Sequence, residues 1–222
     1  MKYVRFLGWS LASWMTALPC VVAADSRGAT ELVRLPAPRR EGSMSIEEAL
    51  VRRRSVRAFR AGDLTPAEMG QLLFAAQGIT DRASGHRAAP SAGATFPLEA
   101  YVVSREGVYR YVPPEHALRL VRAGDHRREL AAAALHQDCV RDASIVIALT
   151  AVSARTAARY GARADRYVNI EAGHAAENVL LQAVALGLGA VPVGAFDDVA
   201  VQTVLQAKKD EAPVYLIPVG RI

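Results

Sequence analysis

The sequence predicts one domain of the α+β or α/β class, in which helices and strands alternate along the chain. A well-capped helix at 65–77, a hairpin pattern at 99–112 and a fully apolar, β-branched run at 144–151 carry this prediction. The 222 residues are 51% hydrophobic and 22% charged, which is enough for a full core and typical of globular proteins. No internal repeat and no second domain are evident.

Residues 1–24 have the features of a secretory signal peptide. Lys2 and Arg5 precede an apolar run, and Val22 to Ala24 supply small residues at a cleavage site before Asp25. We therefore expect export, to the periplasm. The alternative is a retained membrane anchor, because the run is nearly long enough to span a bilayer.

The net charge argues against a nucleic-acid-binding protein, and the number of cysteines excludes an intramolecular disulfide. Removing residues 1–24 takes away two basic residues and no acidic ones, so 25 basic and 22 acidic residues remain and the net charge is +3. This charge is too small and too scattered for a nucleic-acid-binding protein. Only Cys139 remains in the mature chain, so it forms no intramolecular disulfide. We expect it to be buried and not catalytic.

The first part of the mature chain is expected to be a linker or surface arm, followed by a short helix. Residues 25–43 show no periodicity and contain several prolines and arginines. A Ser-x-x-Glu capping box from Ser45 to Glu48 then begins a helix, with Ile46, Ala49 and Leu50 directed inward. The folded domain is therefore expected to span 44–222.

The next helix has clear boundary signals. Thr65 is the expected N-cap, Pro66 the first helical residue and Glu68 the partner that completes the capping box. Gly78 lies at the expected C′ position. A polar loop at 79–89 follows.

A bare turn leads into the predicted hairpin. Pro90 to Ala94 are small or turn-forming residues, and strands are expected at 99–104 and 108–112 around a turn at 105–107. A backbone with so little side-chain bulk can lie against a flat ligand and offer its N–H groups. The alternative is an ordinary loop before a strand, which can have the same composition.

The second half of the chain continues the alternation of helices and strands. Helices are expected at 126–135 and at about 169–186, where the small residues suit close packing against another helix, within the chain or across a dimer. A further helix is capped by Asp197 or Asp198. Strands are expected at 144–151, 190–193 and 213–219.

Several common types of site are absent from the sequence. There is no His-Glu-x-x-His or Cys-x-x-Cys pair, so no metal site is expected. Ser91 is not in a nucleophile elbow, and Gly187-Leu-Gly189 follows a helix where a dinucleotide fingerprint follows a strand. We expect His174 to have a core or interface role.

One basic segment can bind an anion. Arg53, Arg54, Ser55 and Arg57 place three cations and a hydroxyl within five residues, and arginine forks match a phosphate group well. A solvated basic face is the alternative. Arg221, after the last strand, is a further cation that could reach the same anion.

The order of these motifs resembles that of the nitroreductase-like flavoproteins and, more narrowly, of their SagB-type dehydrogenase branch. The resemblance covers 44–222, and no single motif is specific without the others. Six segments carry it: Arg53–Phe59, Pro90–Tyr101, Glu171–Asn178, Leu186–Ala190, Val193–Asp197 and Pro218–Arg221.

This resemblance implies an α+β fold with a central, mostly antiparallel sheet flanked by helices, and an intertwined homodimer with FMN at its interface. Carried over by position, the phosphate of FMN would be held by arginines and a serine, and the ring by small residues of the partner subunit. The phosphate contacts would be Arg53, Ser55, Arg57 and Arg221, with Arg54 beside the ribityl chain or ring, Ser91, Ala92 and Gly93 along the flavin, and Val193 and Gly194 near N5.

The chain departs from the SagB-type pattern at one pair. Branch members that oxidise azolines have a Lys-Tyr pair before the Glu-x-Gly-His helix, and the pair here is Arg166 and Tyr167. Arginine stays protonated and is a poor general base, whereas Tyr167 could still exchange a proton.

The resulting expectation is an FMN-dependent oxidoreductase that passes hydride through flavin N5 to or from a small organic substrate. The alternatives are an azoline-type heterocycle dehydrogenase, in which Arg166 and Tyr167 would act, and a flavin-binding protein without turnover. The sequence identifies neither the substrate nor the electron donor.

Overall fold

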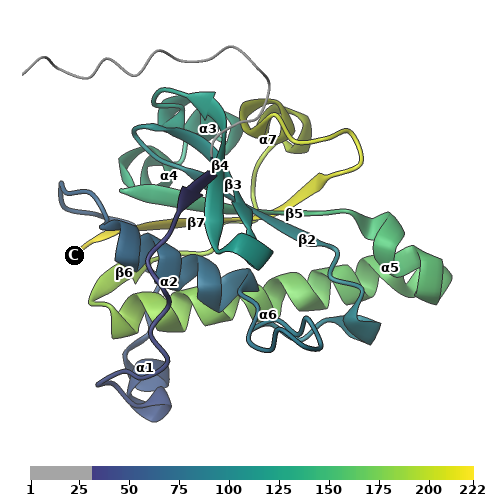
Figure 1. The fold of residues 1–222 in the computed structure, drawn as a ribbon. Coiled ribbons are helices and arrows are strands. Elements are labelled where there is room, and N and C mark those ends of the chain that lie inside the picture. Colours follow the sequence, from purple (N-terminus) through teal and green to yellow (C-terminus); the bar gives the residue numbers. More distant parts are fainter. Residues whose placement is uncertain (1–31) are drawn as a thin grey trace, which may run out of the picture.

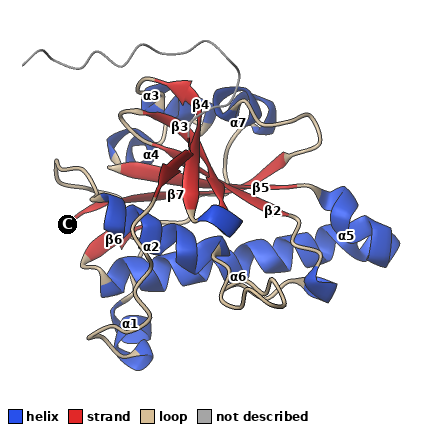
Figure 2. Ribbon diagram, viewed as in Figure 1, coloured by secondary structure: helices blue, strands red, loops and turns tan. Residues whose placement is uncertain are grey.

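The computed structural model describes residues 32–222, so the expected signal peptide at 1–24 lies outside the described residues. One sheet of seven strands organises this part of the chain, in the order β1-β4-β3-β2-β5-β7-β6. Every pairing between neighbouring strands is antiparallel (Figure 2). The predicted α+β class with an antiparallel sheet is therefore confirmed.

The predicted hairpin and the buried strand form the middle of this sheet. All seven residues of the 145–151 strand are buried, because strands lie on both sides of it and helices on both faces. The sequence did not predict the first and fourth strands, which are short or rich in arginine. The strands are β1 Leu32–Arg34, β2 Leu98–Val103, β3 Gly107–Val112, β4 Ala117–Ala123, β5 Ile145–Ala151, β6 Leu188–Ala190 and β7 Ala212–Arg221.

Helices cover both faces of the sheet (Figure 1). α2 (Pro66–Gln77) and α6 (Ala164–Ala185) pack on one face over the larger apolar core. α3 (Arg127–Ala133), α4 (Asp138–Asp142) and α7 (Asp198–Leu205) enclose a second core on the other face. α1 (Ile46–Arg52) and α5 (Ser153–Tyr160) lie at opposite ends of α6.

The predicted capping box of α2 is confirmed, whereas Gly78 lies at the C-cap, one position before the expected C′. The Thr65 hydroxyl accepts the Glu68 N–H at 3.2 Å, and the Thr65 N–H donates to a Glu68 carboxylate oxygen at 2.7 Å. Gly78 ends the helix as its C-cap with a φ of −62°, so its conformation does not require glycine. Its lack of a side chain does matter, because a Cβ there would collide with the Phe74 ring.

The inward orientation predicted for α1 is wrong for two of its three residues. The Ser45 hydroxyl accepts the Glu48 N–H as expected, but Ile46 and Leu50 are 57% and 55% exposed. Only Ala49 is buried, because this seven-residue helix lies at the periphery and touches the domain along one narrow edge.

α6 is longer than predicted and begins at Ala164 instead of about residue 169. Its small residues pack against α2 of the same chain, as one of the two alternatives from the sequence expected. The two helices are also joined by a hydrogen bond of 3.1 Å from Gln71 Nε2 to Gln182 Oε1. Within 32–222, no helix combines the length and the apolar character needed to cross a membrane.

Candidate functional site

The basic segment 53–57 continues the sheet beyond β6. Arg53 caps α1 by donating its N–H to the Ala49 carbonyl at 2.9 Å, and the chain then extends so that Ser55 bridges Ala190 of β6. The Val56 N–H donates to the Ala190 carbonyl at 3.0 Å. This pairing holds the backbone of the segment in place while the Ser55 side chain stays exposed.

Two glycines, one in β6 and one in β7, allow residues 56–59 to cross closely over the sheet. Gly189 and Gly220 are directly paired on β6 and β7. A Cβ on Gly189 would lie 2.7 Å from a Val56 methyl carbon, and one on Gly220 would lie 2.8 Å from the Phe59 ring. The close approach of the crossing segment therefore requires glycine at both positions.

The four arginines predicted to contact the cofactor have different surroundings. Arg53 lies 3.6 Å from a Glu177 carboxylate oxygen, and Arg54 folds back onto the carbonyls of α1, at 2.8 Å from that of Val51. Arg57 is exposed and has no ion pair within the described chain. Arg221 is occupied, because its guanidinium holds both Glu68 oxygens at 2.6 and 2.8 Å.

Cys139 lies close to Arg57 and is buried, as predicted. Burial raises the pKa of its thiol, and the positive charge of Arg57 opposes this rise. The thiol is therefore held in its unreactive, protonated form.

The bare turn at 90–96 is conformationally strained and firmly held. Gly93, Ala94 and Phe96 all have positive φ values, of 58°, 53° and 45°. The Ser91 hydroxyl accepts the Phe96 N–H at 2.9 Å, and Arg155 and Arg159 of α5 donate to the carbonyls of Phe96 and Gly93, both at 3.0 Å. Such strain persists only where the surrounding structure imposes it, and it often marks functional sites.

Contacts within the chain explain why position 93 is a glycine. A Cβ there would lie 2.6 Å from the Tyr160 hydroxyl and 2.8 Å from an Arg159 nitrogen, and the φ of 58° disfavours any side chain. α5, which the sequence did not predict, therefore decides this position even without a ligand.

A cavity of about 260 Å³ separates this turn from the first half of α6. Three polar residues of α6 line it at spacings of four and three, which place them on one helix face. The Tyr167 ring packs edge-on against Tyr160 at 4.9 Å between centroids. The lining residues are Pro90, Ser91, Ala92, Tyr167, Ile170, Glu171 and His174.

Glu171 is the unusual member of this lining. It is 3% exposed, and its Oε1 has no hydrogen-bond partner in the described structure. Burial raises the pKa of its carboxyl group, while the Ser91 hydroxyl and the positive charge of Arg87 act against the rise. The sequence motif that contains Glu171 was noted, but no signal in it singled out this residue.

The side chains of Arg166 and Tyr167 have different surroundings. Both residues lie within α6 and not before it, and only Tyr167 lines the cavity, whereas Arg166 is exposed. His174 is exposed in this chain, so of the core or interface role expected for it, the core alternative is wrong and the interface alternative stays a prediction. It lies beside the exposed Gly173 on the face of α6 that points away from the core.

One chain does not bring all the predicted cofactor contacts together. Arg53 reaches Glu177 of α6, whereas the turn at Ser91 faces Glu171, six residues earlier and about 9 Å away along the helix axis. Val193 pairs with Leu216 of β7 and is buried, and Gly194 beside it is exposed. The residues predicted to bind the phosphate and those predicted to face the ring thus contact different turns of α6.

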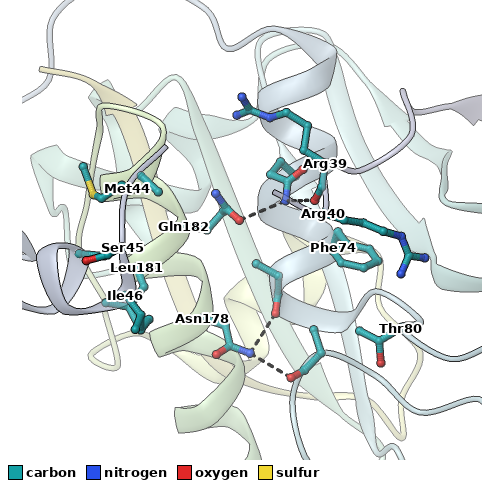
Figure 3. Close-up of a pocket in the computed structure, with 15 residues that line it drawn as sticks. Arg39, Arg40, Met44, Ser45, Ile46, Phe74, Thr80, Asn178, Leu181 and Gln182 are labelled. Carbon is teal, nitrogen blue, oxygen red and sulfur yellow. Dashed lines mark hydrogen bonds between the residues drawn. The ribbon is translucent and has the colours of Figure 1, made fainter. Parts of the chain in front are cut away.

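A larger groove, of about 520 Å³, lies over the other half of α6 (Figure 3). α1, α2 and the arm before α1 border it, and Asn178 donates to the Ala75 carbonyl at 3.1 Å in its floor. None of the predicted cofactor residues lines this groove. Within the described residues, no cluster of three or more His, Cys, Asp or Glu side chains could hold a metal ion.

The comparison with known families decides the assignment. Residues 50–221 match the Nitroreductase family. The chain belongs to the nitroreductase family.

Individual relatives agree with this family. A nitroreductase-type protein of Methanocaldococcus jannaschii is 45% identical over 184 residues, which are 80% of this chain and 91% of that protein. A crystal structure of a nitroreductase-type protein from Ralstonia eutropha has 31% identity and a TM-score of 0.79, and covers 88% of this chain and 91% of its own. One from Anabaena variabilis has 33% identity and a TM-score of 0.70, and covers 79% of this chain and 38% of its own.

The nitroreductase fold predicted from the sequence is thus confirmed, and the family supports a flavin-dependent oxidoreductase activity. The substrate and the narrower branch of the family are matters for proposal.

Proposed function

We propose that this protein is an FMN-dependent oxidoreductase that passes hydride through flavin N5 to a small organic acceptor such as a nitro compound, a quinone or an activated alkene. The match to the nitroreductase family over 50–221 carries the proposal. The exposed basic segment 53–57 and the strained turn at 91–96 support it, because they have the chemistry that a phosphate group and a flat ring require.

The residues of the basic segment fit the phosphate group of FMN. That group carries about −1.5 to −2 charges, so several cations and hydroxyl donors stabilise it. Arg57 and Ser55 are exposed, and Arg53 has only a long contact with Glu177. Arg221 fits less well, because it would have to exchange its two bonds to Glu68 for the phosphate.

We also propose that the site forms between two copies of the chain. The two groups of cofactor residues contact different parts of α6, and in this proposal one copy would supply the phosphate contacts and the other the turn at Ser91–Gly93. Exposed apolar side chains support such an association, since a second copy would remove them from water: Ile46, Leu50, Val51 and Ile170.

When bound, FMN would supply the hydride chemistry. The protein would hold the phosphate with Arg53, Ser55 and Arg57, and Arg54 would lie beside the ribityl chain or ring. Val193 and Gly194 would present backbone near N5, where the exposed Gly194 leaves room because a Cβ there would meet no atom closer than 3.9 Å. The turn at Ser91, Ala92 and Gly93 would cover the ring from the partner subunit.

Cofactor binding is tested with the purified protein and added FMN. We expect a bound yellow chromophore that dithionite bleaches, and NAD(P)H oxidation coupled to a quinone. Arg57→Ala should weaken FMN binding at least about tenfold, because charge-assisted hydrogen bonds contribute about 1.5–3 kcal/mol. The control Arg119→Ala, at an exposed position on β4, should leave the affinity unchanged. Absence of any bound flavin contradicts the proposal, and bound flavin without turnover indicates a flavin-binding protein.

A second candidate activity is the azoline-type dehydrogenase of the SagB-type branch. One observation favours it: Tyr167 lines the cavity beside Glu171, where it could exchange a proton with a substrate. Arg166 is exposed away from that cavity and is not suited to the role. Tyr167→Phe should then abolish thiazoline oxidation with flavin retained, while Arg166→Ala should have little effect. Equal turnover of both variants and wild type would exclude this role for Tyr167, and absence of thiazoline oxidation by flavin-loaded wild type would exclude the activity.

We propose export on the basis of residues 1–24, whose charge and apolar pattern are typical of a signal peptide. The mass of the protein after expression in a bacterium is the test. Cleavage gives an N-terminus at Asp25, whereas an intact N-terminus found in the membrane fraction indicates an anchor.

A further inference from the structure

The carboxyl group of Glu171 has no role in the fold and none in the FMN contacts proposed above. It is almost fully buried, yet Oε1 has no hydrogen-bond partner in the part of the chain that the structure describes. An ionised carboxylate is unfavourable inside a protein, and burial raises the pKa of this group. Glu171 is therefore a buried acid with a raised pKa that borders a cavity.

Among the described residues, no neighbouring cation forms an ion pair with the carboxyl group of Glu171. Arg87 is the nearest cation that acts on it, but Arg87 donates to Gln77 Oε1 at 2.5 Å and stacks on the Phe96 ring at 4.7 Å. The Ser91 oxygen already accepts the Phe96 N–H, which leaves its own proton free to donate toward the carboxyl group. The other titratable groups on the cavity wall are Tyr167 and His174.

The position of the cavity connects this acid to the proposed chemistry. The cavity shares Ser91 and Ala92 with the turn that would cover the flavin ring, and its exposed residues Ile170 and His174 open it to the outside. Its volume of about 260 Å³ is below the range typical for drug-sized ligands, which favours a small acceptor.

We propose that Glu171 is the proton donor to the small organic acceptor reduced at this site. The inference rests on the proposed function, because bound flavin supplies the other reactant. Reduction of a quinone or an activated alkene by two electrons adds one hydride and one proton. Bound flavin would supply the hydride, the carboxyl oxygen of Glu171 would supply the proton, and the resulting carboxylate would regain a proton from solvent through the open side of the cavity.

The decisive experiment compares two acceptors on Glu171→Gln in the FMN-loaded protein. Para-benzoquinone needs a proton for two-electron reduction, whereas ferricyanide accepts one electron and no proton. We expect the variant to reduce para-benzoquinone about 100-fold more slowly, since general acids contribute factors of about 10² or more. Its ferricyanide rate and its flavin spectrum should match those of wild type.

The pH profile gives a second readout that a structural role would not change. The wild-type rate with para-benzoquinone should fall as the pH rises through the raised pKa of Glu171, because the acid form is lost. The profile of Glu171→Gln should lack this step. Asp165→Asn, an exposed carboxylate on the same helix, is the matched control and should retain it.

A third readout requires no activity and no flavin. A carboxyl group whose folded-state pKa is raised contributes stability below its unfolded pKa, and this contribution is lost as the pH rises through the folded pKa. Glu171→Gln should therefore be more stable than wild type at pH 8 and gain less at pH 5. The infrared band of the protonated carboxyl group should vanish in the variant.

Specific outcomes overturn the inference. Equal losses with both acceptors, or no loss with either, contradict proton donation by Glu171. If the amide variant does not fold, Glu171→Leu keeps the volume without the carboxyl group and must show the same selective loss. Absence of FMN binding in wild type would refute the proposed function, whereas the infrared and stability titrations would still show whether Glu171 holds a proton.

Discussion

At the scale of single residues, contacts with distant segments explain the glycine at position 93 and the raised pKa of Glu171. Gly93 is small because Tyr160 and Arg159 of α5 lie against it, and the pKa of Glu171 is raised because α6 and the turn at Ser91 bury its carboxyl group. Neighbours distant in the sequence thus determine both the backbone geometry and the charge state at the cavity.

Gly93→Ala should destabilise the protein by about 1–2 kcal/mol, since its φ of 58° is unfavourable for a residue with a Cβ. The contact with the Tyr160 hydroxyl adds to this cost. Urea unfolding measures the change. Gly42→Ala is the control, because a Cβ there meets nothing within 4 Å. Equal stability of both variants would show that the turn relaxes freely.

At the scale of elements, the N-terminus of α2 is tied to the end of β7. Glu68 completes the capping box of α2 and also holds the Arg221 guanidinium at 2.6 and 2.8 Å. Burial of Glu68 opposes its ionisation, but hydrogen bonds from Arg221 and Thr65 outweigh this effect and lower its pKa. One carboxylate thus stabilises both the helix and the last strand.

Glu68→Gln should cost about 1–2 kcal/mol of stability at pH 7, because the charge-assisted pair with Arg221 is lost, although the amide oxygen can still accept the Thr65 N–H. The difference from wild type should shrink as the pH falls through the lowered pKa, where the wild-type carboxylate itself becomes protonated. Thermal unfolding between pH 3 and 7 provides the measurement, with the exposed Glu41→Gln as control. A loss that is independent of pH would contradict this origin.

Arg221→Ala separates the two roles of this arginine. If Arg221 only holds Glu68, the variant should lose stability to a similar extent as Glu68→Gln and keep its FMN affinity. If Arg221 binds the phosphate, the affinity should fall as well. Isothermal titration with FMN distinguishes these outcomes.

At the scale of the whole molecule, the structure separates the two halves of the proposed cofactor site. The basic segment lies toward the C-terminal half of α6, and the strained turn lies near its N-terminal end (Figure 1). A symmetric pair of chains would form two equivalent sites, each built from one half of each copy.

This arrangement predicts complementation between two impaired variants. Arg57→Ala would remove a phosphate contact, and Ala92→Trp would fill the space for the ring. In a mixed dimer both changes fall in one site, so the other site is intact. At an FMN concentration too low to saturate Arg57→Ala, co-expression should therefore give more bound flavin and more activity than either variant alone. No recovery in an isolated mixed dimer would refute a site shared between copies.

The sequence by itself determined the elements whose signals are local. The caps at Thr65 and Asp197, the hairpin around 105–107 and the apolar strand of β5 depend on neighbouring residues or on composition, and all are confirmed. The ordered motifs also sufficed for the nitroreductase family and its fold.

Only the tertiary structure decided features that depend on contacts between distant residues. The strands β1 and β4 are stabilised chiefly by pairing with each other and with β3, and their composition gave no strand signal. The exposure of Ile46, the pairing of Arg221 with Glu68 and the burial of Glu171 each require a second segment brought close by folding. Side-chain charge and exposure depend on that packing, as does the strained turn at Gly93, whereas the helix caps and the hairpin turn at 105–107 depend on neighbouring residues.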